Sequence, residues 1–164
     1  MIVVSNSSPL ISLAKIESFD LLRQLYGTIT ISEDVFDEVV VWGAGLAGAI
    51  ETSDSPWIHV KPVKRNDVTA AQERFGLGLG ELSTLVLARE VGAELVILDD
   101  LGARKLAQRE GFRIQGTIAI LEAGFRKGHL ADLRGAYTQL LSRGVFLDRG
   151  LLNHSLASLQ LAPI

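Results

Sequence analysis

The chain has 164 residues, of which 48% are hydrophobic and none is cysteine. This length gives one domain with room for a substantial core, and the lack of cysteine excludes disulfides, thiolate nucleophiles and cysteine-based zinc sites. The three histidines are scattered without metal-ligand spacing, so a metal site built from oxygen ligands is the only kind that the composition favours. No apolar run reaches the roughly 18 residues of a membrane-spanning helix and no signal sequence opens the chain, so we expect a cytoplasmic protein that does not bind membranes.

The net charge of −3 conceals an asymmetry between two parts of the chain. Residues 1–100 contain 7 Lys and Arg against 15 Asp and Glu, a charge of −8, whereas residues 101–164 contain 9 against 4, a charge of +5. The acidic part is suited to concentrate cations and the basic part to face an anionic partner. Basic residues also cover ordinary solvated helices, and both interpretations of the basic part stay open.

Two short apolar runs, 2–4 and 95–98, predict buried strands of a parallel sheet. Polar side chains follow both runs: Asn6 comes after the first, and Asp99 and Asp100 come after the second. Ligands of open α/β sheets bind just beyond the carboxyl ends of such strands. The functional site is therefore expected where these two strands end.

Helix and strand patterns alternate along the rest of the chain. The expected helices cover residues 9–16, 19–26, 33–40, 67–75, 81–91, 101–109, 117–126 and about 151–161, and the further strands cover 28–31, 57–61 and 112–115. Ser7 or Ser8 is expected to cap the first helix and Asp99 the helix over 101–109, while the glycine-rich stretch 43–54 is a loop or a weak helix.

This order of elements predicts an α/β fold, a three-layer α/β/α sandwich with a mostly parallel central sheet. A single domain is expected over residues 1–164, with a helical extension from about 148 to 164. The strand over 57–61 alternates in polarity and suits a partly exposed edge position. The leucines of the extension either close the core or meet another subunit.

Two further acids can reach the carboxyl ends of the strands. Glu38 lies near the edge of the apolar stripe of its helix, and Glu81 opens an apolar helix directly after the glycine-rich segment 76–80. A helix dipole alone favours an acid in a first turn, so an ordinary structural role is possible for Glu81. The sharper hypothesis is that one polar pocket gathers the side chains of Asn6, Glu38, Glu81, Asp99 and Asp100.

Taken together, these motifs resemble PIN domains, a family of metal-dependent ribonucleases found in prokaryotic toxin–antitoxin pairs and in RNA processing. The chain is most similar to a prokaryotic PIN-like subfamily whose members open with Ser-Asn-Ser/Thr-Ser/Pro-Leu-Ile. The resemblance spans about residues 1–145. It rests on the order and spacing of the motifs together rather than on any single motif. The matching stretches are 3–11, 31–40, 78–81, 98–100 with Arg104, and Gly116-Thr117.

The resemblance implies that these five side chains are catalytic and that Asn6, Glu38, Glu81 and Asp100 bind Mg²⁺ or Mn²⁺. Asn6 stands where the family has its first acid, and an amide brings no negative charge, so a weaker metal site is implied. Leu98 stands where the family's fourth motif usually has Thr or Ser. Crowded carboxylates repel one another unless a divalent cation neutralises them, and such a cation can polarise a phosphoryl oxygen and lower the pKa of a water for attack on a phosphodiester.

The partners that the resemblance implies are an RNA substrate, a second copy of the chain and a small antitoxin protein. The candidates for contact with RNA are Ser7, Arg104, Lys105 and Arg126. A homodimer would join two acidic pockets into a longer groove. Its expected surface combines the leucines of the tail, Leu151, Leu152, Leu156 and Leu159, with the stretch 39–42.

Two other functions stay open. The chain could be a PIN-fold module that binds RNA or protein after losing catalysis, and Asn6 is the observation that favours this alternative. Asp99 and Asp100 could instead form a phospho-acceptor or haloacid-dehalogenase-type site. The Asp-x-Asp arrangement of those phosphatases is missing, and no lysine follows in a matching position.

Overall fold

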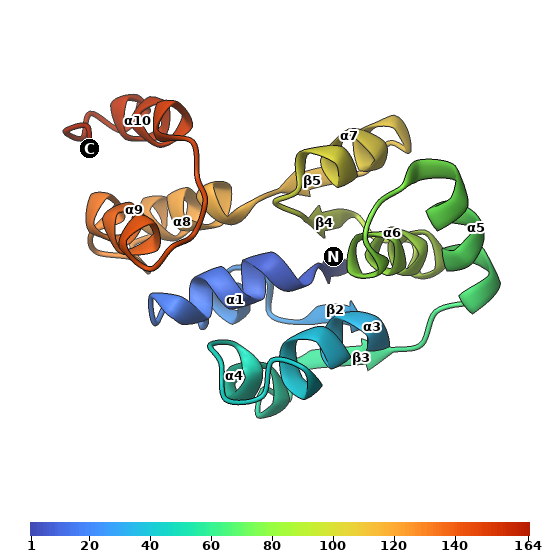
Figure 1. Cartoon of the computed structure of the whole chain (residues 1–164). Coiled ribbons are helices and arrows are strands. Elements are labelled where there is room, and N and C mark those ends of the chain that lie inside the picture. Colours follow the sequence, from blue (N-terminus) through green and yellow to red (C-terminus); the bar gives the residue numbers. More distant parts are fainter.

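The computed structural model describes all 164 residues and places a five-stranded parallel sheet in the middle of the molecule (Figure 1). The strand order is β3-β2-β1-β4-β5, and all four neighbouring pairs are parallel. The strands are β1 (Val3–Ser5), β2 (Ile29–Ser32), β3 (Ile58–Lys61), β4 (Leu95–Ile97) and β5 (Arg113–Gln115). The expected edge position of β3 is confirmed, and β1 and β4 lie at the centre.

Helices connect the strands and cover both faces of the sheet. They are α1 (Ser7–Lys15), α2 (Leu21–Tyr26), α3 (Glu33–Phe36), the π-helix η1 (Asp37–Val41), α4 (Ala49–Ser53), α5 (Arg65–Phe75), α6 (Leu79–Val91), α7 (Leu101–Arg109), α8 (Thr117–Arg126), α9 (Leu133–Ser142) and α10 (Arg149–Ser158). A helix is present in every range where one is expected, but the range 33–40 is divided between α3 and η1, and α9 lies outside the expected elements. No helix meets the length and hydrophobicity needed to cross a bilayer.

Two cores form because successive residues of a strand face opposite sides of the sheet. Val3 and Ile97 point into the larger core, which they share with α1, α2, α8, α9 and α10. Val4 and Val96 point into the smaller core, which they share with α6 and α7. In Figure 1, α5, α6 and α7 lie to the right of the sheet and α1, α8, α9 and α10 to the left. The expected three-layer α/β/α sandwich is confirmed.

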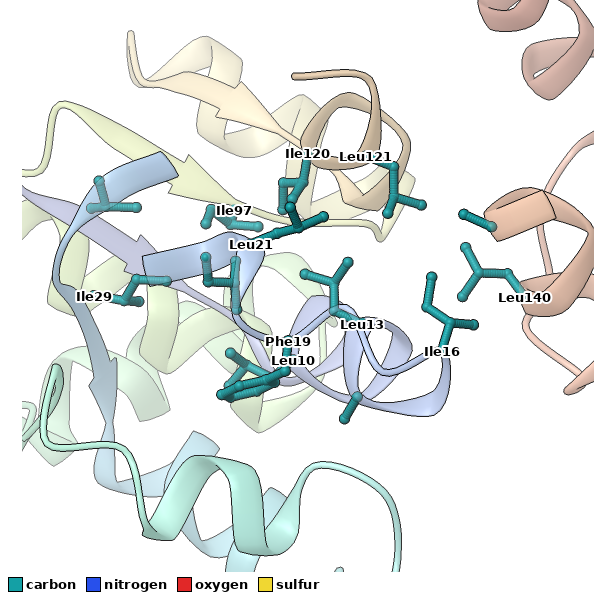
Figure 2. Packing of buried hydrophobic residues seen from close by; sticks show 14 of the residues in the cluster. Leu10, Leu13, Ile16, Phe19, Leu21, Ile29, Ile97, Ile120, Leu121 and Leu140 are labelled. Atoms are coloured by element: carbon teal, nitrogen blue, oxygen red, sulfur yellow. The ribbon is translucent and has the colours of Figure 1, made fainter. Parts of the chain in front are cut away.

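The larger core is centred on α1. Leu10 and Leu13 of this helix are fully buried, and Figure 2 shows them beside Leu21 of α2 and Ile120 of α8. Each fully buried leucine stabilises the fold by about 1.5–3 kcal/mol relative to an exposed one. This packing fixes the direction of α1, whose first residues lie at the carboxyl edge of the sheet.

The C-terminal tail closes this core. Leu152 and Leu156, one helical turn apart on α10, are completely buried in it, and Leu159 packs against it. Of the two roles expected for the tail, closing the core is the one these leucines perform, so they are not available for a dimer surface. Leu151 alone among the four leucines points outward, with 56% of its surface exposed.

Candidate functional site

Asn6 lies directly after β1 and caps α1, so the expectation that Ser7 or Ser8 is the N-cap is wrong. Its backbone N–H donates to the Ile97 carbonyl at 3.0 Å, which extends the pairing of β1 with β4 by one residue. The Asn6 side chain forms no capping hydrogen bond; its Oδ1 accepts from Ser7 Oγ at 3.4 Å. With only 2% of its surface exposed, Asn6 is a buried polar group held over the end of the central strand.

Glu38 comes from an irregular helix rather than the continuous α-helix expected over 33–40. Ser32 caps α3, with its Oγ accepting from the Val35 N–H at 3.1 Å. After four residues the chain widens into η1, closed by an i→i+5 bond from Trp42 N–H to the Asp37 carbonyl at 2.8 Å. Such π-turns are rare and recur at functional sites because they change the direction of one side chain.

Asn6 and Glu38 meet over Gly80, in the first turn of α6. A Cβ built on Gly80 would lie 2.6 Å from Glu38 Oε2 and 3.4 Å from Asn6 Oδ1. The first distance is shorter than real Cβ contacts, so any side chain at this position would displace the Glu38 carboxylate. Gly80 therefore provides the space in which these two side chains come together.

Buried hydroxyls hold this turn in place. The Gly80 carbonyl accepts from Ser83 Oγ at 3.1 Å and from Thr84 Oγ1 at 2.7 Å, and Ser83 Oγ also lies 2.8 Å from Ser32 Oγ at the end of β2. Ser83 and Thr84 are fully buried. The sequence does not identify these residues as part of the site. The signal that could have found them is the pair of adjacent hydroxyls inside the apolar segment 82–88, because buried hydroxyls need hydrogen-bond partners.

Glu81 lies beside this pair and carries an unfavourable charge. Burial raises the pKa of Glu81, and the negative charges of Asp100 and Glu38 raise it further. Its carboxylate is turned back toward the start of its own helix, where the N–H groups of Glu81 and Gly78 partly offset the rise. Two carboxylates are thus close enough to act on a third, Glu81, at the end of the central strands.

Asp99 and Asp100 are adjacent but accept hydrogen bonds from different helices. Asp100 is the N-cap of α7, with its Oδ1 accepting from the Ala103 N–H at 2.8 Å, so the expected capping by Asp99 is wrong. Asp99 instead accepts from the N–H and the Oγ1 of Thr117 at 2.7 and 2.6 Å, which ties the end of β4 to α8. Asp100 is the member of the pair whose charge acts on Glu81.

The four candidates for RNA contact have different positions. Ser7 is buried and its hydroxyl donates to Asn6. Arg104 reaches Gly116, where its Nη1 lies 2.8 Å from the position of an added Cβ. Lys105 is exposed on α7 and lines a hollow that contains none of the five site residues. Arg126 lies in the last turn of α8, about 14 Å along that helix from its start, so Arg104 is the cation that the structure brings to the site.

The donor set fits a hard divalent cation in its chemistry. It consists of the amide oxygen of Asn6 and the carboxylates of Glu38, Glu81 and Asp100, and such oxygens are the preferred ligands of Mg²⁺ and Mn²⁺. In the present side-chain positions no three acidic or histidine residues lie close enough to hold a metal ion. The turned-back Glu81 carboxylate is one physical reason, because it faces Gly78 rather than Glu38.

Comparison with known proteins bears on the family of the chain. The family model described as "DUF3368: PIN domain" matches residues 2–160. No curated protein matches the chain. PIN domains are generally nucleases that use divalent metal ions, which gives the acidic edge of the sheet a family context and leaves the phospho-acceptor alternative without support. Because the match extends over almost the whole sequence, the chain belongs to the PIN-domain family.

Proposed function

We propose that this chain is a metal-dependent endoribonuclease that hydrolyses single-stranded RNA, and that it is the toxin of a toxin–antitoxin pair. The observation that carries the proposal is the meeting of Asn6 and Glu38 over Gly80, next to a Glu81 whose pKa is raised by burial and by neighbouring charges. Crowded carboxylates of this kind cost stability in a protein without metal. Their presence at the carboxyl ends of parallel strands supports a binding role.

The residues that would hold Mg²⁺ or Mn²⁺ are Asn6, Glu38, Glu81 and Asp100. When bound, the cation supplies charge neutralisation, polarisation of a phosphoryl oxygen and an acidified water. The chain's own residues prepare the site: Ser7 orients the Asn6 amide, and the hydrogen bonds to the Gly80 carbonyl fix the turn below Glu38.

Asp99 and Arg104 have supporting roles beside the metal ligands. Asp99 holds the N-terminus of α8 in place through its two hydrogen bonds with Thr117. Arg104 Nη1 and Asp99 Oδ1 both lie 2.8 Å from the Cβ position of Gly116, yet they form no ion pair. The guanidinium is therefore free to contact a phosphate of the RNA strand and to hold that strand against the acidic edge.

Cleavage of labelled single-stranded RNA by the purified protein in Mn²⁺ tests the proposal. Glu81→Gln keeps the shape of the side chain and removes its charge, so cleavage is expected to fall roughly 100-fold or more. Glu73→Gln, an exposed acid on α5, is the matched control and should cleave like the wild type. Equal cleavage by Glu81→Gln and wild type would contradict the assignment.

A second function has specific support. Asn6 replaces a charged ligand with a neutral one, and no three acids are arranged to hold a metal ion. These observations favour a PIN-fold module that binds RNA or protein without cutting. RNA binding without cleavage by the wild type, in Mg²⁺ and in Mn²⁺, would establish this alternative.

We also propose a homodimer, on a surface that keeps Val41 and Trp42 of the expected stretch 39–42 but excludes the tail leucines and Val39, because Leu152, Leu156 and Val39 are buried. The apolar side chains of Val41, Trp42, Leu46 and Ile50 are all exposed in the short segment that runs from the end of η1 into α4, with Trp42 71% exposed. Light scattering at micromolar concentration should give twice the 17.7 kDa of the chain, and the mass of one chain would contradict the dimer.

The proposed antitoxin is a different partner. It would cover the acidic edge with a basic or aromatic side chain.

A further inference from the structure

Phe146 is the most exposed large hydrophobic side chain of the protein, with 99% of its surface accessible. It lies between α9 and α10, and its two neighbours, Val145 and Leu147, both pack against the larger core. The Val145 N–H also donates to the Leu140 carbonyl at 3.0 Å, and Asp148 caps α10. The loop is thus anchored on both sides of Phe146, and of its three apolar side chains only that of Phe146 is directed away from the core.

Phe146 lines a hollow of about 270 Å³ next to the acidic edge. Asp99 lines the same hollow, and so do three polar residues on one face of α1: Ser8, Ser12 and Lys15. Their spacing of i, i+4 and i+7 places them in a row about 10 Å long, which starts at Ser8, two residues after Asn6. Lys15 takes part in none of the four ion pairs of the structure.

We propose that this hollow, here called the Phe146 pocket, binds one unpaired nucleotide of single-stranded RNA next to the site of cleavage, with its base stacked on Phe146 and its phosphate near Lys15. The proposal rests on the proposed function, because the row along α1 leads from the acidic edge. Exposed aromatic rings flanked by cations are how proteins hold single strands without reading their sequence. The pocket is smaller than the roughly 300–1,000 Å³ of a drug-sized ligand site and suits a single flat ring.

Fluorescence anisotropy of a short labelled RNA in EDTA tests the pocket, because binding is then measured without cleavage. Phe146→Ala should weaken binding about 5- to 100-fold, the range for the loss of one stacked base, whereas Phe146→Trp should bind at least as well as the wild type. Phe75→Ala is the control, since Phe75 is a partly exposed aromatic on α5, at the other end of the molecule (Figure 1). Circular dichroism should show the same fold for all variants.

A second measurement identifies the base as the contact. Removal of one base from the RNA, at the position that the wild type is most sensitive to, should weaken binding by the wild type but not by Phe146→Ala. Equal losses in both proteins would overturn the proposal even where Phe146→Ala binds weakly. Unchanged affinity of Phe146→Ala together with a changed mass in light scattering would also overturn it and identify a protein contact.

The outcomes separate this proposal from the proposed function. A wild type that cleaves RNA, together with a Phe146→Ala variant that binds with unchanged affinity, would overturn the Phe146 pocket alone. A wild type that binds but never cleaves would overturn the nuclease while the pocket stood. No binding of RNA by the wild type would overturn both.

Discussion

The interior of the sheet and its carboxyl edge are built from the same strands but differ in what their side chains do. Along β1 and β4, Val4 and Ile97 are completely buried among other apolar side chains. Directly after β1, Asn6 is equally inaccessible but polar, and it faces Glu38 across Gly80. Beside them, burial and neighbouring charges raise the pKa of Glu81.

The buried strands and their carboxyl edge therefore contribute differently: the interior stabilises the fold and the edge is suited to binding. Removing atoms from the interior should lower stability, because packing contacts are lost and a cavity is left. Removing charge from the edge should raise stability while destroying binding, because the carboxylates there repel one another. Mutations in the two regions are therefore expected to have opposite effects on stability.

The largest expected change in stability comes from the interior. Leu10→Ala removes a fully buried side chain from the larger core, and we expect the free energy of unfolding to fall by about 2–5 kcal/mol. Leu101→Ala, an exposed leucine in the first turn of α7, should stay within about 0.5 kcal/mol of the wild type. Denaturant unfolding measures both, and equal effects would remove the distinction between core and surface.

The next effect should appear in binding rather than in stability. Gly80→Ala introduces a Cβ that collides with Glu38 Oε2, so affinity for Mn²⁺ in calorimetry should fall about 10- to 100-fold. Stability should change by no more than about 1 kcal/mol, because alanine favours the helix. Gly150→Ala changes the same position of α10 and should leave Mn²⁺ affinity intact. Unchanged affinity in Gly80→Ala would show that Glu38 is not a ligand.

A smaller gain is expected from restoring charge at the edge. Asn6→Asp adds a carboxylate beside Glu38, so Mn²⁺ affinity should rise roughly tenfold and the rate of RNA cleavage should increase. Without metal the same variant should be less stable, since a buried negative charge at residue 6 would face the carboxylate of Glu38. Asn66→Asp, on the exposed surface of α5, is the control. Calorimetry that finds equal affinity in Asn6→Asp and wild type would place residue 6 outside the metal site.

The smallest effect concerns the salt dependence of RNA binding. Arg104→Gln should lower the slope of log affinity against log salt by roughly 0.7, the contribution of one phosphate contact to a single strand. Arg126→Gln should leave the slope unchanged, because Arg126 lies at the far end of α8. The reverse result would move the RNA path away from Gly116 and toward the end of that helix.

Much of this arrangement could be predicted from the sequence. Alternating and helical apolar patterns define the strands and most helices, because burial imposes those periods. Parallel strands end at a common edge, which brings Asn6 near Asp100 without any knowledge of loops. The placement of Glu38 and Glu81 near them needed the PIN-domain resemblance as well, since an acid on a helix is usually just solvated.

Other features could not be predicted because neighbouring residues offered equivalent chemistry. Asp99 and Asp100 are both good caps, and only the packed structure decides that Asp100 is used; likewise Asn6 rather than Ser7 occupies the N-cap position of α1, without a capping hydrogen bond from its side chain. The π-helix at Glu38 could not be recognised in the sequence, because the apolar pattern of this segment fits an α-helix equally well. Phenylalanine is usually a core residue, so the sequence gives no sign that Phe146 is exposed. Its exposure follows from the packing of its two neighbours against the core.

The raised pKa of Glu81 predicts how the stability of the metal-free protein depends on pH. Because the pKa of Glu81 is raised in the folded protein, the unfolded chain releases this proton more readily, and the ionised carboxylate destabilises the fold once pH exceeds its ordinary value of 4.5. Metal-free Glu81→Gln should therefore unfold at a higher temperature than the wild type at pH 7. This difference should shrink as pH falls through the raised pKa and vanish below pH 4.5.

The most direct test is thermal unfolding of wild type and Glu81→Gln at pH 7, each with and without Mn²⁺. If the carboxyl edge is a site of crowded carboxylates that bind a divalent cation, Mn²⁺ should raise the unfolding temperature of the wild type and have little effect on the variant. The variant should be the more stable of the two without metal. An equal rise with Mn²⁺ in both proteins, or a metal-free variant less stable than the wild type, would contradict this account.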